Sequence, residues 1–211
     1  MDVYLNLFME DLLMYCILVT GLPASGKSTL ARALGEALSL PVLSKDDVKE
    51  LLFDDIGFDS RAQKVALGVA ALDAMFYAAR QMLRCGIPVI LENNCENATR
   101  EPLQRLLDET VCTPITVMLT CEPHVLHERF VRRNTSPDRH RGHVVNDHYP
   151  ERTPGRPVEP PTFDAFWTTM TARGMADFAV DGPRIELDMT HPETADVPAL
   201  AARIRDIVRT L

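Results

Sequence analysis

The sequence has few of the features that mark secreted, disulfide-bonded or membrane-spanning chains. Aromatic residues make up only 6% of the 211 residues, and there is a single tryptophan. The five cysteines are odd in number and contain no Cys-x-x-Cys pair, which disfavours a disulfide framework or a zinc ribbon. The apolar run at residues 12–19 is too short to span a bilayer, and no basic residue precedes Lys27, unlike in a secretory signal. We therefore expect a cytoplasmic protein with reduced thiols and no membrane association.

Positive charge is also scarce. There are 22 basic and 30 acidic residues, which gives a net charge of -8. A protein whose main task is to hold a nucleic-acid backbone needs a surplus of positive charge, so nucleic acid is disfavoured as a partner. The length suits one domain, which we place at residues 14–211 after an N-terminal extension of unknown role at residues 1–13. Nothing in the sequence indicates an oligomeric state.

Short aliphatic runs alternate along the chain with longer stretches of helical period. The runs are continuous, which is typical of strands buried on both faces. The pattern predicts an α/β fold, a three-layer sandwich with a five-stranded parallel sheet and helices on both faces. The predicted strands cover residues 15–20, 41–44, 89–92, 115–120 and 184–189. The predicted helices cover residues 28–38, 61–84, 101–109, 124–133, 163–173 and 197–211.

One segment departs from this pattern. Residues 134–162 contain six prolines and a cluster of arginine and histidine, without a periodic apolar face. A structureless stretch of this length in a compact domain is usually a functional lid or a binding loop. We expect an Arg/His-rich, mobile lid at about residues 134–160.

Residues 21–29, Gly-Leu-Pro-Ala-Ser-Gly-Lys-Ser-Thr, fit the phosphate-loop motif G-x-x-x-x-G-K-[ST] between a predicted strand and a predicted helix. Gly21 and Gly26 permit turns in which successive N–H groups point at one anion, and the helix adds its positive dipole end. We expect Lys27 to reach the β- and γ-phosphates and the Ser28 hydroxyl to bind Mg²⁺. The motif predicts a P-loop NTPase with ATP and Mg²⁺ as cofactors. The other expected nucleotide contacts are Pro23, Ala24, Ser25 and Thr29.

The rest of the chain favours a kinase among phosphate-loop proteins. The guanine-binding motifs of a GTPase are missing where they are needed, and the chain has no room for the additional parts of a motor ATPase. A kinase needs a carboxylate that accepts the proton of the attacking hydroxyl. Asp46 ends the second predicted strand, on the edge of the sheet where ligands bind. We predict Asp46 as catalytic base and Asp47 as helix cap; the alternatives are that these residues only cap the following helix, or that their two roles are reversed.

Residues 21–29 and the segment Ser-Lys-Asp-Asp-Val-Lys at 44–49 resemble the polynucleotide-kinase-like group of P-loop kinases. This group includes 5′-hydroxyl polynucleotide kinase, chloramphenicol phosphotransferase and the zeta toxins. The matching segment of that polynucleotide kinase is Arg-Asp-Asp-Tyr-Arg, in which the first Asp is the general base and the final Arg contacts substrate and phosphate. The resemblance implies these roles for Asp46 and Lys49. Lys49 lacks the bidentate fork of an arginine, which argues against a polynucleotide substrate more than against the chemistry.

The third predicted strand ends in Glu92, at the acidic position of that group, and Asn93 and Asn94 follow. Glu92 would hold a Mg²⁺-bound water or orient the acceptor hydroxyl. The alternative is that Glu92 pairs with Lys27 or Lys49 when the site is empty. Asn94 is expected to line the acceptor pocket.

Arg129 and Arg133 are four residues apart on the helix that leads into the lid, so they share one face. This R-x-x-x-R pattern is similar to the start of the lid in adenylate kinases, where the first Arg lies over the adenine and the second clamps the transferring phosphate. The resemblance implies nucleotide binding for Arg129 and a catalytic role for Arg133. The alternative is a solvated basic helix face. Arg139 and Arg141 add positive charge to the lid, and the sequence does not distinguish their roles.

Together these patterns predict an ATP-dependent kinase that transfers the γ-phosphoryl group to a hydroxyl of a small molecule, such as an antibiotic, a nucleoside or a sugar-like metabolite. The expected partners are ATP and that acceptor, and the expected catalytic residues are Asp46, Lys27 and Arg133. One alternative is a 5′-hydroxyl nucleic-acid kinase, which would need a positive channel leading to Asp46. Another is a nucleotide-binding ATPase or switch without a phosphoryl acceptor.

Overall fold

Five parallel strands form one sheet. The computed structural model describes residues 14–153 and 155–211, so the expected N-terminal extension, residues 1–13, lies outside the described residues. The strands are β1 (Tyr15–Gly21), β2 (Val42–Ser44), β3 (Val89–Glu92), β4 (Thr113–Thr120) and β5 (Arg184–Asp188). Their order is β2-β3-β1-β4-β5, and every neighbouring pair is parallel. This confirms the predicted sheet, with each strand boundary within two residues of the expected one.

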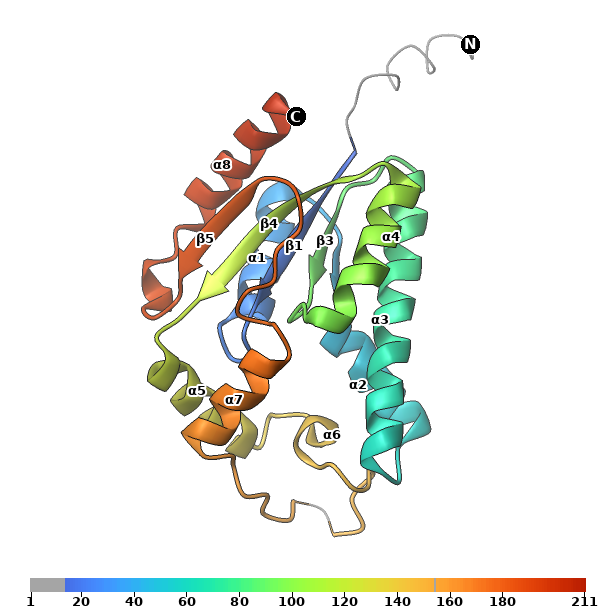
Figure 1. Ribbon diagram of the computed structural model, residues 1–211, viewed down its shortest axis with the longest axis vertical. Coiled ribbons are helices and arrows are strands. Elements are labelled where there is room, and N and C mark those ends of the chain that lie inside the picture. Colours follow the sequence, from blue (N-terminus) through green and yellow to red (C-terminus); the bar gives the residue numbers. More distant parts are fainter. Residues whose placement is uncertain (1–13, 154) are drawn as a thin grey trace.

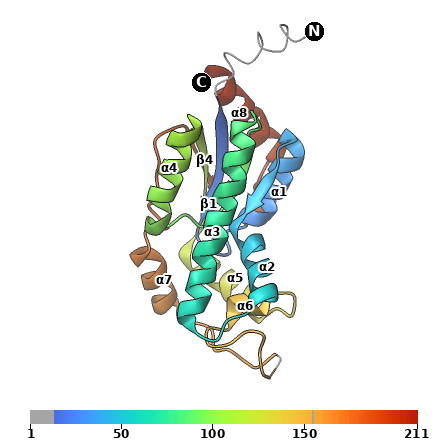
Figure 2. The same ribbon diagram turned by 90° about the vertical axis from the view of Figure 1, so that its right-hand side faces the viewer.

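Helices cover both faces of the sheet, which confirms the three-layer arrangement. The α-helices are α1 (Lys27–Leu38), α2 (Lys45–Ile56), α3 (Arg61–Arg84), α4 (Arg100–Thr110), α5 (Pro123–Thr135), α6 (Arg141–Val144), α7 (Phe163–Ala172) and α8 (Val197–Thr210). Two 3₁₀ turns, η2 (Asn97–Thr99) and η3 (Pro192–Thr194), complete the described elements. Helices α1 and α8 pack on one face of the sheet, and α3 and α4 pack on the other (Figures 1 and 2).

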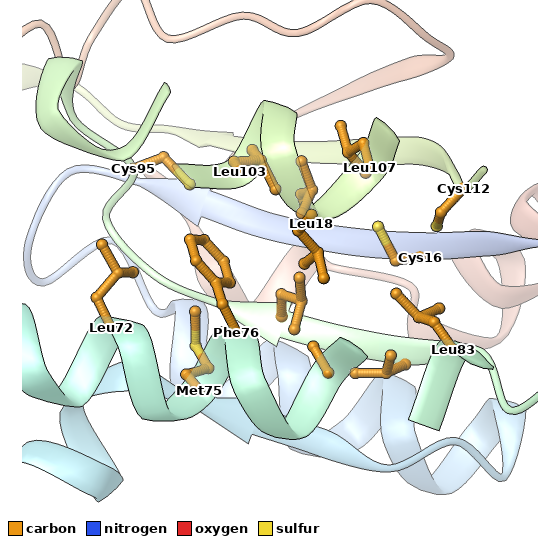
Figure 3. Close-up of a cluster of buried hydrophobic side chains, with 14 of the residues drawn as sticks. Cys16, Leu18, Leu72, Met75, Phe76, Leu83, Cys95, Leu103, Leu107 and Cys112 are labelled. Carbon is orange, nitrogen blue, oxygen red and sulfur yellow. The ribbon is translucent and has the colours of Figure 1, made fainter. Parts of the chain in front are cut away.

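The alternation of side chains along β1 divides the core into two layers. Ile17 and Val19 point to the α1 and α8 side, whereas Cys16 and Leu18 point to the α3 and α4 side. All four are buried, because β1 lies at the centre of the sheet. Figure 3 shows the second layer, in which Phe76 of α3 lies among the buried side chains of β1, β3 and α4. This double burial explains why the strand is continuously apolar in sequence.

The carboxyl ends of the strands define one edge of the molecule. Helices α2, α5, α6 and α7 gather beyond this edge (Figure 1). Strand β1 runs from it into the phosphate loop, β2 runs into α2, and β3 ends there in Glu92. Parallel strands place their carboxyl ends together, so segments far apart in sequence meet at this edge.

The lid is more ordered than the sequence suggests. Residues 134–162 contain the short helix α6, and the buried Val145 packs in a small apolar cluster with Phe53 of α2 and Phe58. The expectation of a structureless stretch was therefore wrong for this part of the segment. The cluster uses isolated apolar residues whose partners lie on α2 and in the α2–α3 turn, and such single residues leave no periodic signal.

The longest helix, α3, has 24 residues and carries charged side chains along its length, among them Lys64 and Asp73. Within residues 14–153 and 155–211, no helix is both long enough and apolar enough to cross a bilayer.

Candidate functional site

The phosphate loop occupies the turn between β1 and α1. A Cβ atom on Gly21 would lie 2.4 Å from the backbone oxygen of Leu119 on β4, so no side chain fits there. Gly26 is the N-cap of α1 and has a left-handed φ of 94°, and Ala24 has a φ of 70°. A non-glycine residue in this region carries roughly 1–3 kcal/mol of strain, which is a common property of ligand sites. The loop thus presents the N-terminus of α1, whose N–H groups and dipole attract an anion.

Lys27 is the first residue of α1 and is 6% exposed. Its Nζ donates a hydrogen bond of 2.8 Å to the backbone oxygen of Leu22, in the same loop. Burial lowers the pKa of Lys27 to about 8, although the carboxylates of Glu92 and Asp46 act in the opposite direction. An ammonium has three donors, so Lys27 keeps hydrogen-bonding capacity for a phosphate oxygen.

A cavity of about 600 Å³ lies in front of the loop. It brings together most of the residues predicted from sequence: Pro23, Ala24, Gly26, Lys27, Ser28, Thr29, Asp46, Glu92, Asn94, Arg129 and Arg133. It also contains residues to which sequence reasoning gave no site role: Arg32, Asp47, Glu50, Arg132, Ser136 and Arg139. Of these, Glu50 had a usable signal, because it follows Asp46 by four residues and therefore shares its helix face.

Three predicted residues do not line this cavity. Gly21 lies behind the loop against β4, and Ser25 is buried, with no hydrogen-bond partner for its hydroxyl among the described residues. The ammonium of Lys49 lies 5.3 Å from the centre of the Phe53 ring and close to Gly68 of α3. The role of Lys49 in substrate binding therefore stays a prediction.

Asp46 stands in the first turn of α2, and the helix is capped by the residue two positions before it. Ser44 is the N-cap, and its Oγ accepts a hydrogen bond of 3.3 Å from the backbone N–H of Asp47. The expectation that Asp47 caps the helix was wrong, since the helix begins three residues earlier than that role requires. The carboxylate of Asp47 lies instead 3.7 Å from Arg32. Asp46 is thus not needed as a cap.

The environment of Asp46 favours its ionised form. The side chain is 38% exposed and lies 3.9 Å from the guanidinium of Arg139. Burial acts to raise the pKa of Asp46, but nearby basic side chains outweigh it and hold the pKa below its ordinary value. In order of decreasing effect these side chains are His143, Lys49, Arg139 and Lys27. An ionised carboxylate at this position can accept a proton.

Glu92 lies at the end of β3 and is 4% exposed. Its Oε2 accepts a hydrogen bond of 2.7 Å from the hydroxyl of Ser44 on the neighbouring strand β2. Burial raises the pKa of Glu92, while Lys27 and the bond from Ser44 act to lower it. Sequence reasoning missed Ser44, which links the end of β3 to the start of α2 and so places Glu92 and Asp46 at one cavity.

The two arginines of α5 have different surroundings. Arg129 donates hydrogen bonds of 2.6 and 2.8 Å to the backbone oxygens of Met189 and Thr190, in the segment after β5. Burial and the neighbouring Arg139 lower the pKa of Arg133 to about 10, so it is still charged at neutral pH. The Nε of Arg133 is buried and has no hydrogen-bond partner among the described residues. A buried donor of this kind is costly unless a ligand satisfies it.

The residues around the cavity fit a triphosphate and a divalent cation. Hydroxyl and carboxylate oxygens are the ligands that Mg²⁺ prefers, and Ser28, Asp46 and Glu92 line the cavity together. The strained loop, the N-terminus of α1 and the unsatisfied Nε of Arg133 suit the phosphates.

The fold and this site define a P-loop protein of the kinase-like type. The chain belongs to the AAA domain family AAA_33, whose model matches residues 16–148. The match covers the phosphate loop, Asp46, Glu92 and the start of the lid.

Solved structures that resemble this chain are described as kinases. The crystal structure of a "putative kinase" from Chloroflexus aurantiacus has a TM-score of 0.76 and 31% identity, and covers 92% of this chain and 98% of that one. A sugar kinase from a Janibacter species has a TM-score of 0.55 at 14% identity, covering 92% of this chain and 95% of that one, and shows the shared fold alone.

Uncharacterized proteins of Mycobacterium bovis and Mycobacterium tuberculosis are 34% identical over 128 residues, which is 55% of this chain. The matched region spans 25% of the length of these relatives, so they contain much that this chain does not match.

Proposed function

We propose that this protein is an ATP-dependent kinase that transfers the γ-phosphoryl group to a hydroxyl of a small-molecule acceptor. The observation that carries the proposal is the position of Asp46, an ionised carboxylate at the same cavity as the phosphate loop and Lys27. A protein that only binds nucleotide has no need of a proton acceptor there. The small-molecule kinase among the structures of the same fold supports this reading.

Each part of the cavity has a distinct task in this proposal. The loop and the N-terminus of α1 hold the phosphates, and Lys27 donates to their oxygens. When bound, Mg²⁺ would neutralise charge on the phosphoryl oxygens, with oxygen ligands offered by Ser28 and by the carboxylate of Glu92. Arg133 stabilises the charge on the group being transferred, and Arg129 holds the segment after β5.

The reaction forms a bond between the acceptor oxygen and the γ-phosphorus and breaks the bond from that phosphorus to ADP. The hydroxyl proton passes to Asp46. Because basic neighbours hold the pKa of Asp46 below its ordinary value, this carboxylate is free to accept the proton at neutral pH.

The charge around the cavity favours a small acceptor over a nucleic acid. Four carboxylates, Asp46, Asp47, Glu50 and Glu92, are interspersed with the basic side chains of the lining. The chain as a whole has a net charge of -8. A nucleic-acid kinase would need a continuous positive track, and its oligonucleotide affinity would fall steeply with salt. Five free cysteines also support a reducing, cytoplasmic location.

The test is a panel of hydroxyl acceptors with γ-labelled ATP, run on the wild-type protein and on Asp46→Asn. We expect Asp46→Asn to lower kcat by about 100-fold, because it removes the proton acceptor, and to leave the Kd for ATP within twofold. The control is Asp55→Asn, an exposed carboxylate at the far end of the same helix, which should leave both values unchanged. Equal turnover by wild type and Asp46→Asn would reject the proposal.

A further inference from the structure

Helix α2 presents three carboxylates to the lid. Asp46, Glu50 and Asp54 are spaced by four residues and therefore lie along one face of the helix. Each contacts a basic side chain of residues 139–143, which are ordered around α6. Only the first two of these carboxylates line the cavity in front of the phosphate loop. The middle residue, Glu50, has no role in the mechanism described so far.

Glu50 makes two contacts with the lid. Its Oε1 lies 2.9 Å from Nε2 of His143, and the same oxygen lies 3.7 Å from Nη1 of Arg139. Arg139 also approaches Asp46, at 3.9 Å from its Oδ2. Glu50 therefore holds two lid side chains beside the proposed catalytic base.

Arg139 forms ion pairs with Asp46 and Glu50 but still has unused hydrogen-bond donors. Its distances to Asp46 and Glu50 exceed the limit of about 3.5 Å for a hydrogen bond. Its Nε is buried and has no hydrogen-bond partner among the described residues, although the side chain lines the cavity. A guanidinium in this condition has donors left for an oxygen-rich anion, and a transferring phosphoryl group carries three such oxygens.

Other contacts keep the lid on α2 without Glu50. A Cβ atom on Gly142 would lie 2.4 Å from Phe53, so α6 packs directly on that ring. The ammonium of Lys64 on α3 donates hydrogen bonds to the backbone oxygens of His143 and Val145, at 2.9 and 2.5 Å. Because these anchors are independent, the contacts of Glu50 affect the orientation of two side chains more than the docking of the segment.

We propose that Glu50 is a positioning residue, which orients the guanidinium of Arg139 toward the γ-phosphoryl group of the nucleotide. The inference rests on the proposed function in that it assumes a triphosphate in the cavity. Glu50 thereby couples two things: the docking of the lid on α2 and the contact of Arg139 with the terminal phosphate. His143 contacts the same carboxylate oxygen, Oε1, and so holds the Glu50 side chain in place.

The first test needs binding only, so it does not depend on phosphoryl transfer. The Kd values of ADP and of the non-hydrolysable analogue AMP-PNP are measured by calorimetry for wild type, Glu50→Gln, Arg139→Gln and the double variant. We expect wild type to prefer AMP-PNP, and each single variant to lose about tenfold of that preference, the effect of one charge-assisted contact. The double variant should lose no more than Arg139→Gln alone, because Glu50 acts through Arg139.

The matched control is Asp54→Asn. Asp54 lies on the same face, 3.0 Å from Nε2 of His140 and 2.7 Å from the hydroxyl of Tyr149, but outside the cavity. It should keep the wild-type preference within twofold. If Glu50→Gln behaves like Asp54→Asn, or if its effect multiplies with that of Arg139→Gln, the inference is wrong.

The second test measures turnover with an acceptor from the panel. Glu50→Gln should raise the KM for ATP about tenfold, in line with its loss of AMP-PNP binding, and should also lower kcat, because the misplaced arginine matters most in the transition state. An unchanged kcat/KM for ATP would contradict the inference. A protein that shows the expected AMP-PNP preference but no transfer to any acceptor would contradict the proposed function and leave the role of Glu50 supported.

Discussion

The phosphate loop and the contact between the lid and α2 meet at one cavity but are built in opposite ways. The loop is nine consecutive residues whose shape depends on local backbone conformation, with positive φ values at Gly21, Ala24 and Gly26. The lid contact joins residues that are far apart in the chain, such as Glu50 and His143, 93 positions apart. Binding of phosphate is therefore encoded locally, whereas the closure of the cavity depends on tertiary packing.

The two regions also differ in how much they contribute to stability and to catalysis. The loop holds Lys27 in a buried position, where burial lowers its pKa to about 8. Burial of a charge costs stability, so the loop stabilises the fold little and serves the ligand. The lid has its own apolar cluster around the fully buried Phe53. Substitution of Lys27 should therefore impair chemistry alone, and substitutions under the lid should impair stability as well.

The largest expected effect is that of Lys27→Met, which tests the loop side of this contrast. It removes the cation that faces the phosphates, so turnover should fall by about 10³-fold. The free energy of unfolding, measured with urea, should not decrease, because the variant also removes a buried charge. If the free energy of unfolding of Lys27→Met falls so far that unfolding explains the lost turnover, the loop does contribute to stability and the contrast with the lid is wrong.

Phe53→Ala tests the lid side. Phe53 packs against Phe58, with ring centres 5.2 Å apart, and against the backbone of Gly142. Truncating it should lower the free energy of unfolding by about 3 kcal/mol and should expose residues 134–162 to limited proteolysis. The Kd for ADP should stay within twofold, while kcat falls.

The control for Phe53→Ala is Leu106→Ala, at a fully buried position of α4 in the core cluster away from the lid. It should cost similar stability and leave kcat of the folded protein unchanged. If Phe53→Ala and Leu106→Ala lower kcat equally, the effect of Phe53→Ala comes from a general loss of stability and not from the lid.

The sequence predicted what depends on short-range pattern. The sheet was recognisable because strands buried on both faces are continuously apolar, as in β1 and β4. The loop was recognisable because its backbone conformation requires glycine at positions 21 and 26, and this requirement shows directly in the sequence. Most of the expected site residues line one cavity for the same reason, since parallel strands bring their carboxyl ends together.

The sequence missed what depends on tertiary contact. Ser44 was overlooked in favour of Asp47 because both are good capping residues, and only the start of α2 decides between them. The substrate contact predicted for Lys49 came from a matching position in a motif and stays a prediction, with its ammonium 5.3 Å from the centre of the Phe53 ring. The role inferred for Glu50 depends on a lid whose partners no local pattern indicates.

The smallest effect is a pH dependence that separates the loop from the lid. Above pH 8, Lys27 loses its proton in the nucleotide-free protein, while phosphates, with a secondary pKa of about 6, are already ionised. Proton loss removes the attraction, so the Kd for ATP should be flat from pH 7 to 8 and then rise by up to about tenfold per pH unit. Calorimetry from pH 7 to 9.5 measures this.

The controls are two variants. The lid variant Asp54→Asn should keep the rise in Kd above pH 8, and Lys27→Arg should lack it because a guanidinium stays protonated. A wild-type Kd that is constant to pH 9.5 would show that the buried ammonium does not control phosphate binding.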